Sequence, residues 1–111
     1  MPARYKSVEP DVARRLIAGG AHVIDVRGKE EWAAGHVEGS DRISAGQISS
    51  HSVGRADTVI VVCANGKLSK RAARKLAKEG YQTYHLDGGL AAWHDLGLPL
   101  ISSNGSRATV L

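Results

Sequence analysis

The chain has 111 residues and a formal net charge of +4, from 15 lysines and arginines against 11 aspartates and glutamates. This length fits one domain with its own core. No aromatic-interleaved basic tract accompanies the charge, so nucleic acid is not an expected partner. No apolar run resembles a signal peptide or a membrane span, so we expect no membrane association either. The single cysteine excludes an internal disulfide and a multi-cysteine metal cage. We expect a cytoplasmic protein, because a lone thiol stays reduced there.

The first half of the chain alternates between short strand-like and helix-like segments. Strands are expected at residues 5–8, 21–26 and 42–44. Helices are expected at residues 11–18, 29–34 and 47–52, and Pro10 suits the first turn of the earliest one. The signals at 42–44 and 47–52 are the weakest of these.

The second half gives clearer signals. Residues 58–62 form a continuous apolar run, which is typical of a strand buried on both faces of a parallel sheet. Further elements are expected as a helix at 69–79, a strand at 81–86 and a helix at 90–96. This alternation predicts an α/β domain with a mainly parallel sheet. Residues 101–111 are rich in small and polar side chains, so we expect a flexible tail after a domain of residues 1–100.

The only cysteine, Cys63, directly follows the predicted strand 58–62. Ligands of open parallel sheets bind at the carboxyl ends of strands, so the thiol stands where such folds do chemistry. A tight loop that contains Gly66 and enters a helix can direct backbone N–H groups inward and favour an anion. Such a cradle favours the thiolate, which is the reactive form of cysteine, and Ser69 is expected to be the N-cap. The alternative is a buried structural cysteine, which is common.

Three sequence blocks resemble the signatures of the rhodanese family. Residues 24–27 (IDVR), 31–32 (EW) and 35–40 (GHVEGS) resemble the first, D-V-R-x-x-x-E-[FYW]-x-x-G-H-I-x-G-A. Residues 61–69 (VVCANGKLS) resemble the active-site loop, and residues 86–93 (LDGGLAAW) with Gly97 and Pro99 resemble the C-terminal signature. The blocks keep the family's order and spacing and span residues 5–99. The resemblance implies a three-layer α/β/α domain around a five-stranded, mainly parallel sheet.

The resemblance also implies an activity. A donor such as thiosulfate would give its sulfane sulfur to Cys63, and the persulfide would pass it to cyanide, a thiol or a thiol-bearing protein. No metal or organic cofactor is implied. The implied substrate-binding loop consists of Ala64, Asn65, Gly66, Lys67, Leu68 and Ser69. Many members carry arginine where this chain has Leu68, which leaves Lys67 as the loop's only cation for a small anionic donor.

Three charged residues are candidates for support of the loop. Asp25 and Arg27 end the predicted strand 21–26, so they reach the same sheet edge as Cys63, and we expect a structural ion pair or a loop anchor. Arg71 is the best placed of several cations on the predicted helix 69–79 to draw anions to the loop, although a solvated helix surface is the simpler interpretation. His22, His51, His85 and His94 show no metal-ligand spacing, and we expect no function for them.

Two other functions remain open at this stage. A cysteine phosphatase needs C-x5-R, but the position of that arginine is held by Ser69, so phosphatase activity is not expected. A sulfur carrier or protein-binding module without efficient thiosulfate turnover is kept open by Leu68.

Overall fold

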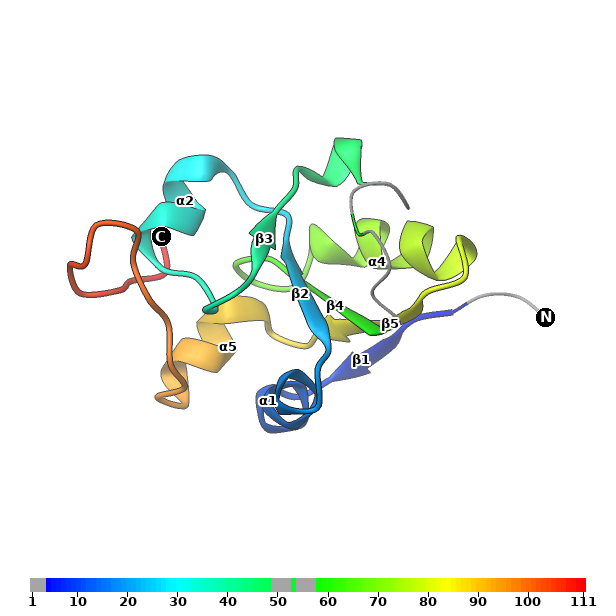
Figure 1. Ribbon diagram of the computed structural model, residues 1–111, viewed down its shortest axis with the longest axis horizontal. Helices are drawn as coiled ribbons and strands as arrows, with labels where there is room; N and C mark the ends of the chain where they lie inside the picture. The colour runs from blue at the N-terminus through cyan, green and yellow to red at the C-terminus, as the bar shows by residue number, and fades with distance from the viewer. Residues whose placement is uncertain (1–3, 49–52, 54–57) are drawn as a thin grey trace.

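Five parallel strands form the centre of the molecule. The computed structural model describes residues 4–48, 53 and 58–111 (Figure 1). The strands are β1 (Lys6–Val8), β2 (His22–Asp25), β3 (Asp41–Arg42), β4 (Thr58–Val62) and β5 (Gln82–Leu86). The sheet order is β1-β5-β4-β2-β3, and every pairing is parallel. The expected α/β class with a five-stranded sheet is confirmed.

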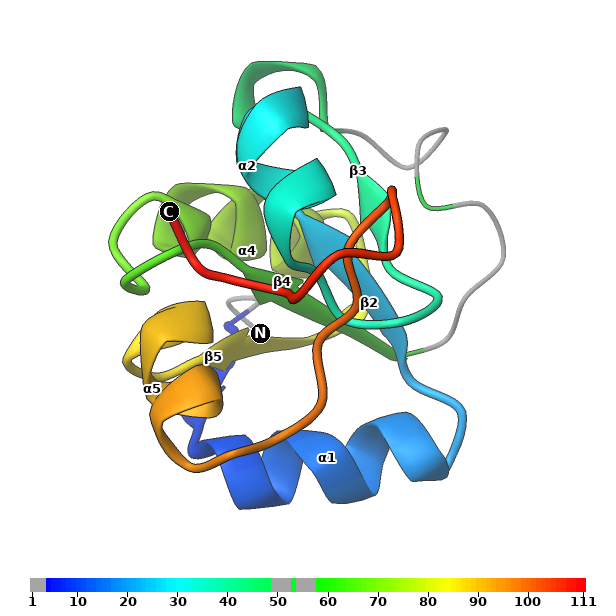
Figure 2. The same ribbon diagram turned by 90° about the vertical axis from the view of Figure 1, so that its left-hand side faces the viewer.

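Helices cover both faces of this sheet. The helical elements are α1 (Pro10–Ala18), α2 (Lys29–Ala34), the 3-10 turn η1 (Ala45–Gln47), α4 (Ser69–Lys78) and α5 (Gly89–Asp95). Figure 2 shows α1 and α5 on one side of the sheet and α4 on the other. None of the helices in the described ranges is long and apolar enough to cross a membrane.

The central strand β4 supplies side chains to both layers of the core. Val59 and Val61 pack with Ala72, Ala73 and Leu76 of α4. The alternate residues of β4 pack in the opposite layer, together with Ala13 of α1 and with Leu90 and Trp93 of α5. Because side chains alternate along a strand, a strand covered on both faces must be apolar throughout. This explains the uninterrupted run that predicted β4.

The boundaries of most elements agree with the expectations, and β4 and α2 match at both ends. The strand expected at 42–44 is shifted to Asp41–Arg42, because it pairs only with Ile24 and Asp25 at the end of β2. Most of the helix expected at 47–52 lies outside the described residues. The described part before it forms η1 instead.

Residues 101–111 lie beside α2 (Figures 1 and 2). The backbone hydrogen bonds that place them join Ile101 with His36 in both directions, Ser103 with Ala33, and Thr109 with Ala34. A Cβ on Gly35 would overlap the backbone carbonyl of Thr109, so the crossing requires glycine. Val110 packs against the core layer of α1 and α5. We propose that this segment, expected to be a flexible tail, stays docked on the domain.

Candidate active site

Cys63 lies at the carboxyl end of the central strand β4. The neighbouring strand β2 ends at the same level, because Asp25 pairs with Val62 and the Val26 N–H donates to the Val62 carbonyl. Cys63 is buried, with 2% of its surface exposed, and it belongs to the core layer under α4. The parallel topology therefore brings the thiol to the sheet edge that the sequence predicted.

The sulfur atom of Cys63 is surrounded by hydrogen-bond donors from the loop and from α4. The Gly66 N–H donates to Sγ at 3.2 Å, and the Ser69 N–H donates at 3.3 Å. The Ser69 Oγ lies 3.2 Å from Sγ and can accept from the thiol or donate to the thiolate. Hydrogen bonds donated to an ionised acceptor are stronger than those between neutral groups. The arrangement therefore stabilises negative charge on the sulfur.

Ser69 does not play the part expected of it. The N-cap of α4 is Leu68, and Ser69 is the first residue of the helix. Its hydroxyl contacts Cys63 Sγ. The prediction of an N-cap was wrong because Leu68 holds the cap position and α4 already begins at Ser69, whose hydroxyl contacts the sulfur.

The Cys63 loop is held from behind by the start of α5. The Leu90 N–H donates to the Cys63 carbonyl, and the Ala91 N–H donates to the Ala64 carbonyl, both at 2.9 Å. Gly89 makes this approach possible, because a Cβ there would lie 2.6 Å from the backbone of Cys63, Ala64 and Gly66. The glycine pair before α5 thus supports the loop by close packing as well as by its turn.

His85 of β5 holds the loop from a third side, which the sequence analysis missed. Its Nε2 lies 2.6 Å from the Gly66 carbonyl, and its Nδ1 lies 3.1 Å from the Ser7 hydroxyl. The side chain is 1% exposed. His85 stands three residues before the glycine pair in sequence but 19 residues after Gly66. No local spacing could have indicated the contact.

The outer part of the loop faces solvent. Asn65 Oδ1 accepts the Lys67 N–H at 3.0 Å, which closes a small turn at the tip. Lys67 and Leu68 are exposed, Leu68 at 51%. Together with Arg71 they line a groove of about 670 Å³ whose other wall is Ala45 and Gly46 of η1. The structure thus places both expected cations, Lys67 and Arg71, beside one groove at the loop.

Asp25 and Arg27 form a buried ion pair. Arg27 Nη2 lies 2.7 Å from Asp25 Oδ2, and Arg27 Nε lies 2.9 Å from Asp25 Oδ1. Arg27 Nη2 also donates to the Gly35 carbonyl at 2.7 Å, while its Nη1 is buried without a hydrogen-bond partner among the described residues. Neither side chain hydrogen-bonds to the Cys63 loop among the residues described. The pair connects β2 to the end of α2.

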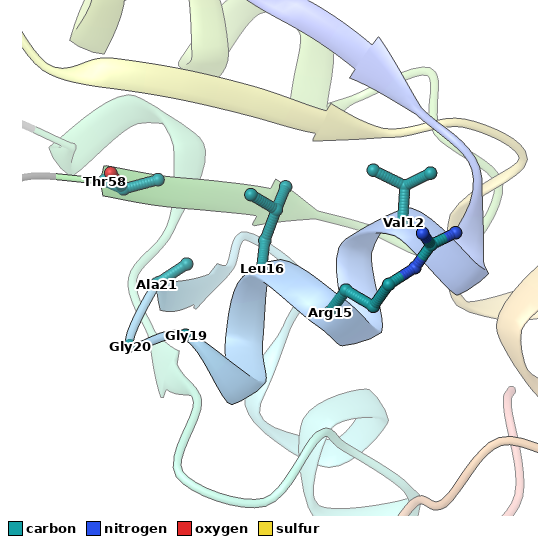
Figure 3. Close-up of a pocket in the computed structure, with 7 residues that line it drawn as sticks. All are labelled: Val12, Arg15, Leu16, Gly19, Gly20, Ala21 and Thr58. Atoms are coloured by element: carbon teal, nitrogen blue, oxygen red, sulfur yellow. The ribbon is translucent and has the colours of Figure 1, made fainter.

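Other parts of the surface offer less chemistry. A groove of about 460 Å³ lies between α1 and Thr58, and Figure 3 shows the residues that line it. Thr58 begins β4, so this groove lies at the opposite end of the strand from Cys63. Among the residues described, no three His, Cys, Asp or Glu side chains are grouped as metal ligands.

Comparisons with known proteins agree with this geometry. Residues 9–96 match the model of the rhodanese-like domain family. The chain is similar to "Thiosulfate sulfurtransferase GlpE" of Pseudomonas aeruginosa strain LESB58, at 32% identity over 95% of this chain and 97% of the relative. The protein of the same name in Pseudomonas fluorescens strain SBW25 is 34% identical, over 95% and 99%. A rhodanese-related protein from Thermoplasma volcanium superposes with a TM-score of 0.79 at 25% identity, over 87% of this chain and 98% of that one.

The chain belongs to the rhodanese-like domain family. Within that family it is an enzyme of the rhodanese sulfurtransferase type.

Proposed function

We propose that the chain transfers sulfane sulfur through a persulfide on Cys63. The thiolate attacks the outer sulfur of thiosulfate or a related donor, and the sulfur–sulfur bond of the donor breaks with its electron pair leaving on sulfite. The resulting Cys63 persulfide anion is then attacked at its outer sulfur by a thiolate or cyanide. That step returns the Cys63 thiolate and forms a new persulfide or thiocyanate, so charge and atoms balance in both steps.

One observation carries this proposal: two backbone N–H groups and one hydroxyl converge on Cys63 Sγ at the carboxyl end of β4. Donors placed in this way stabilise a thiolate before the reaction. The same donors suit the thiolate that leaves when the persulfide is discharged. The names of the relatives support thiosulfate as one donor for this chain.

Lys67 and Arg71 are proposed to attract the anionic donor, because both line the groove beside the loop. Neither has an ion-pair partner among the described residues, so their charge is free to act on a ligand. The attraction is long-range and falls with added salt. Lys67→Ala should therefore raise the KM for thiosulfate several-fold at low salt. Lys78→Ala is the matched control, because Lys78 is exposed at the other end of α4.

The persulfide itself is the most direct test. After treatment with thiosulfate or polysulfide, intact-mass analysis should show one added sulfur atom that cyanide removes. Cys63→Ala should show no added sulfur and no turnover while it keeps the circular dichroism spectrum of the fold. Turnover by Cys63→Ala would contradict the proposed nucleophile.

A sulfur carrier that discharges a partner's persulfide is the second candidate. One observation favours it: the exposed apolar Leu68, at a position where many family members carry arginine, stands at the groove. Leu68→Arg separates the two. A rise in thiosulfate turnover would indicate that Leu68 limits this donor, whereas a persulfide that forms from polysulfide but never from thiosulfate would indicate the carrier. In either case we propose a cytoplasmic location, where the thiol is kept reduced.

A further inference from the structure

His85 is a buried polar side chain that the sulfur chemistry described so far does not use. It lies on β5, beside β4, and its two ring nitrogens have different partners. Gly66 offers a carbonyl, which only accepts, so His85 Nε2 must carry the proton. Nδ1 of the neutral ring is then an acceptor for the Ser7 hydroxyl. The contacts thus select one tautomer.

The surroundings also keep this ring neutral. Burial lowers the pKa of His85 from its ordinary value of 6.5, and the positive charge of Lys70 on α4 lowers it further. The hydrogen bond to the Gly66 carbonyl and the negative charge of Asp87 raise this pKa, but burial is the largest influence and the net direction is down. Tyr5 of the chain before β1 lies edge-on to the ring, with centroids 5.8 Å apart. A neutral ring with a fixed tautomer is a rigid donor at neutral pH.

The recipient of this hydrogen bond is the residue that contacts the sulfur. Gly66 accepts from His85 through its carbonyl at 2.6 Å and donates to Cys63 Sγ through its N–H at 3.2 Å. Its φ is +88°, in the left-handed region, so its orientation is one among several that glycine allows. Residues with such freedom keep one conformation only where their surroundings impose it.

We propose that His85 is a positioning residue that holds Gly66 so that the Gly66 N–H stays directed at Cys63 Sγ. This role of His85 rests on the proposed function in one respect: that function makes the stabilised Cys63 thiolate the acceptor of the sulfane sulfur. Among the described residues, His85 hydrogen-bonds to Ser7 and Gly66 and not to the sulfur or the groove residues, so it acts through the Gly66 backbone.

The matched variants are His85→Met and His85→Gln, which have similar length. Only glutamine has an amide N–H that can replace Nε2–H. The readout is the rate of Cys63 alkylation by iodoacetamide, followed by intact mass, because it requires no sulfur donor. At neutral pH, His85→Met should react about tenfold more slowly, since a hydrogen bond to a charged group is worth at least that factor. At alkaline pH, where the thiol is fully ionised, its rate should rejoin that of the wild type.

His85→Gln should stay within about threefold of the wild type, and His94→Gln, an exposed histidine of α5, should not change the rate. The proposal is overturned if His85→Met alkylates like the wild type at neutral pH, or if His85→Gln is as slow as His85→Met. A merely structural role would slow alkylation or lower stability equally in both variants and at every pH.

The unmodified protein gives a second measurement if His85→Met does not fold. Nuclear magnetic resonance should find His85 as the Nε2–H tautomer, with a ring proton that exchanges slowly with solvent; an Nδ1–H tautomer would refute the contact with Gly66. A wild type that alkylates as predicted but never acquires sulfane sulfur would remove the proposed function and leave the role of His85 intact.

Discussion

Replacing Gly89 with alanine tests the close packing behind the Cys63 loop. Gly89 has a φ of +65°, and its added Cβ would lie 2.6 Å from backbone atoms of Cys63, Ala64 and Gly66. Backbone atoms that are hydrogen-bonded to α5 have little freedom to move aside. Gly97 is the matched control, because its φ is +73° and a Cβ there would meet none of the described atoms within 4 Å.

The comparison separates backbone strain from steric overlap. Alanine in the left-handed region costs about 1–2 kcal/mol, and the smaller entropy of its unfolded chain returns about 0.4–1 kcal/mol. Gly97→Ala should therefore lower the free energy of unfolding by about 1 kcal/mol. Gly89→Ala adds an overpacking cost of about 1–3 kcal/mol, which gives about 2–4 kcal/mol in all. Against a typical total of about 5–15 kcal/mol, both variants should still fold.

Urea titrations of both variants measure these free energies, and alkylation of Cys63 measures the loop. Gly89→Ala should be the less stable variant and should alkylate at a changed rate, because the loop that orients donors toward the sulfur must shift. Gly97→Ala should alkylate like the wild type. Equal stability of the two variants, or an unchanged alkylation rate in Gly89→Ala, would refute the idea that this contact shapes the loop.

The buried pair, the C-terminal segment and His85 give three more predictions. Asp25→Asn should lower the free energy of unfolding by about 3–5 kcal/mol in urea, because it strands the Arg27 charge; a loss below 1 kcal/mol would contradict this. Removal of residues 101–111 should lower the Tm by several degrees in a thermal scan. An unchanged Tm would instead support the flexible tail that the sequence predicts. The folded pKa of His85 is lowered, so its stabilising contribution is complete above pH 6.5 and is lost as the pH falls through the folded value. His85→Gln should therefore flatten the acid side of a stability–pH profile, and an identical slope would exclude this contribution.

Local patterns were sufficient for most of the fold. The apolar run of β4 and the helix that ends at Gly35 were delimited by signals within a few residues. The shift of β3 was not predictable in the same way, because β2 determines where pairing ends. The proposed docking of residues 101–111 depends on hydrogen bonds with the end of α2, which is far from them in the sequence.

The candidate site, too, was predictable only where neighbouring residues in the sequence carry the signal. Cys63 and its loop were found because strand, cysteine, glycine and helix follow one another in sequence. The roles of Ser69 and His85 were not, because each depends on which partner the fold brings within reach. The local sequence indicated a capping function for Ser69 and no function for His85. In the structure, Ser69 contacts the sulfur of Cys63, and His85 contacts the Gly66 carbonyl.

The single thiol determines how the proposed Cys63 persulfide can be discharged. These 111 residues contain one cysteine, so no second thiol of the chain is available to expel the bound sulfur as a disulfide forms. Under the proposed chemistry, discharge must await a collision with a molecule from outside, and the sheltered position of Cys63 restricts which molecules can make it. The fraction of enzyme that carries sulfur would then fall as the concentration of acceptor rises. When acceptor is scarce, the chain would retain its sulfur.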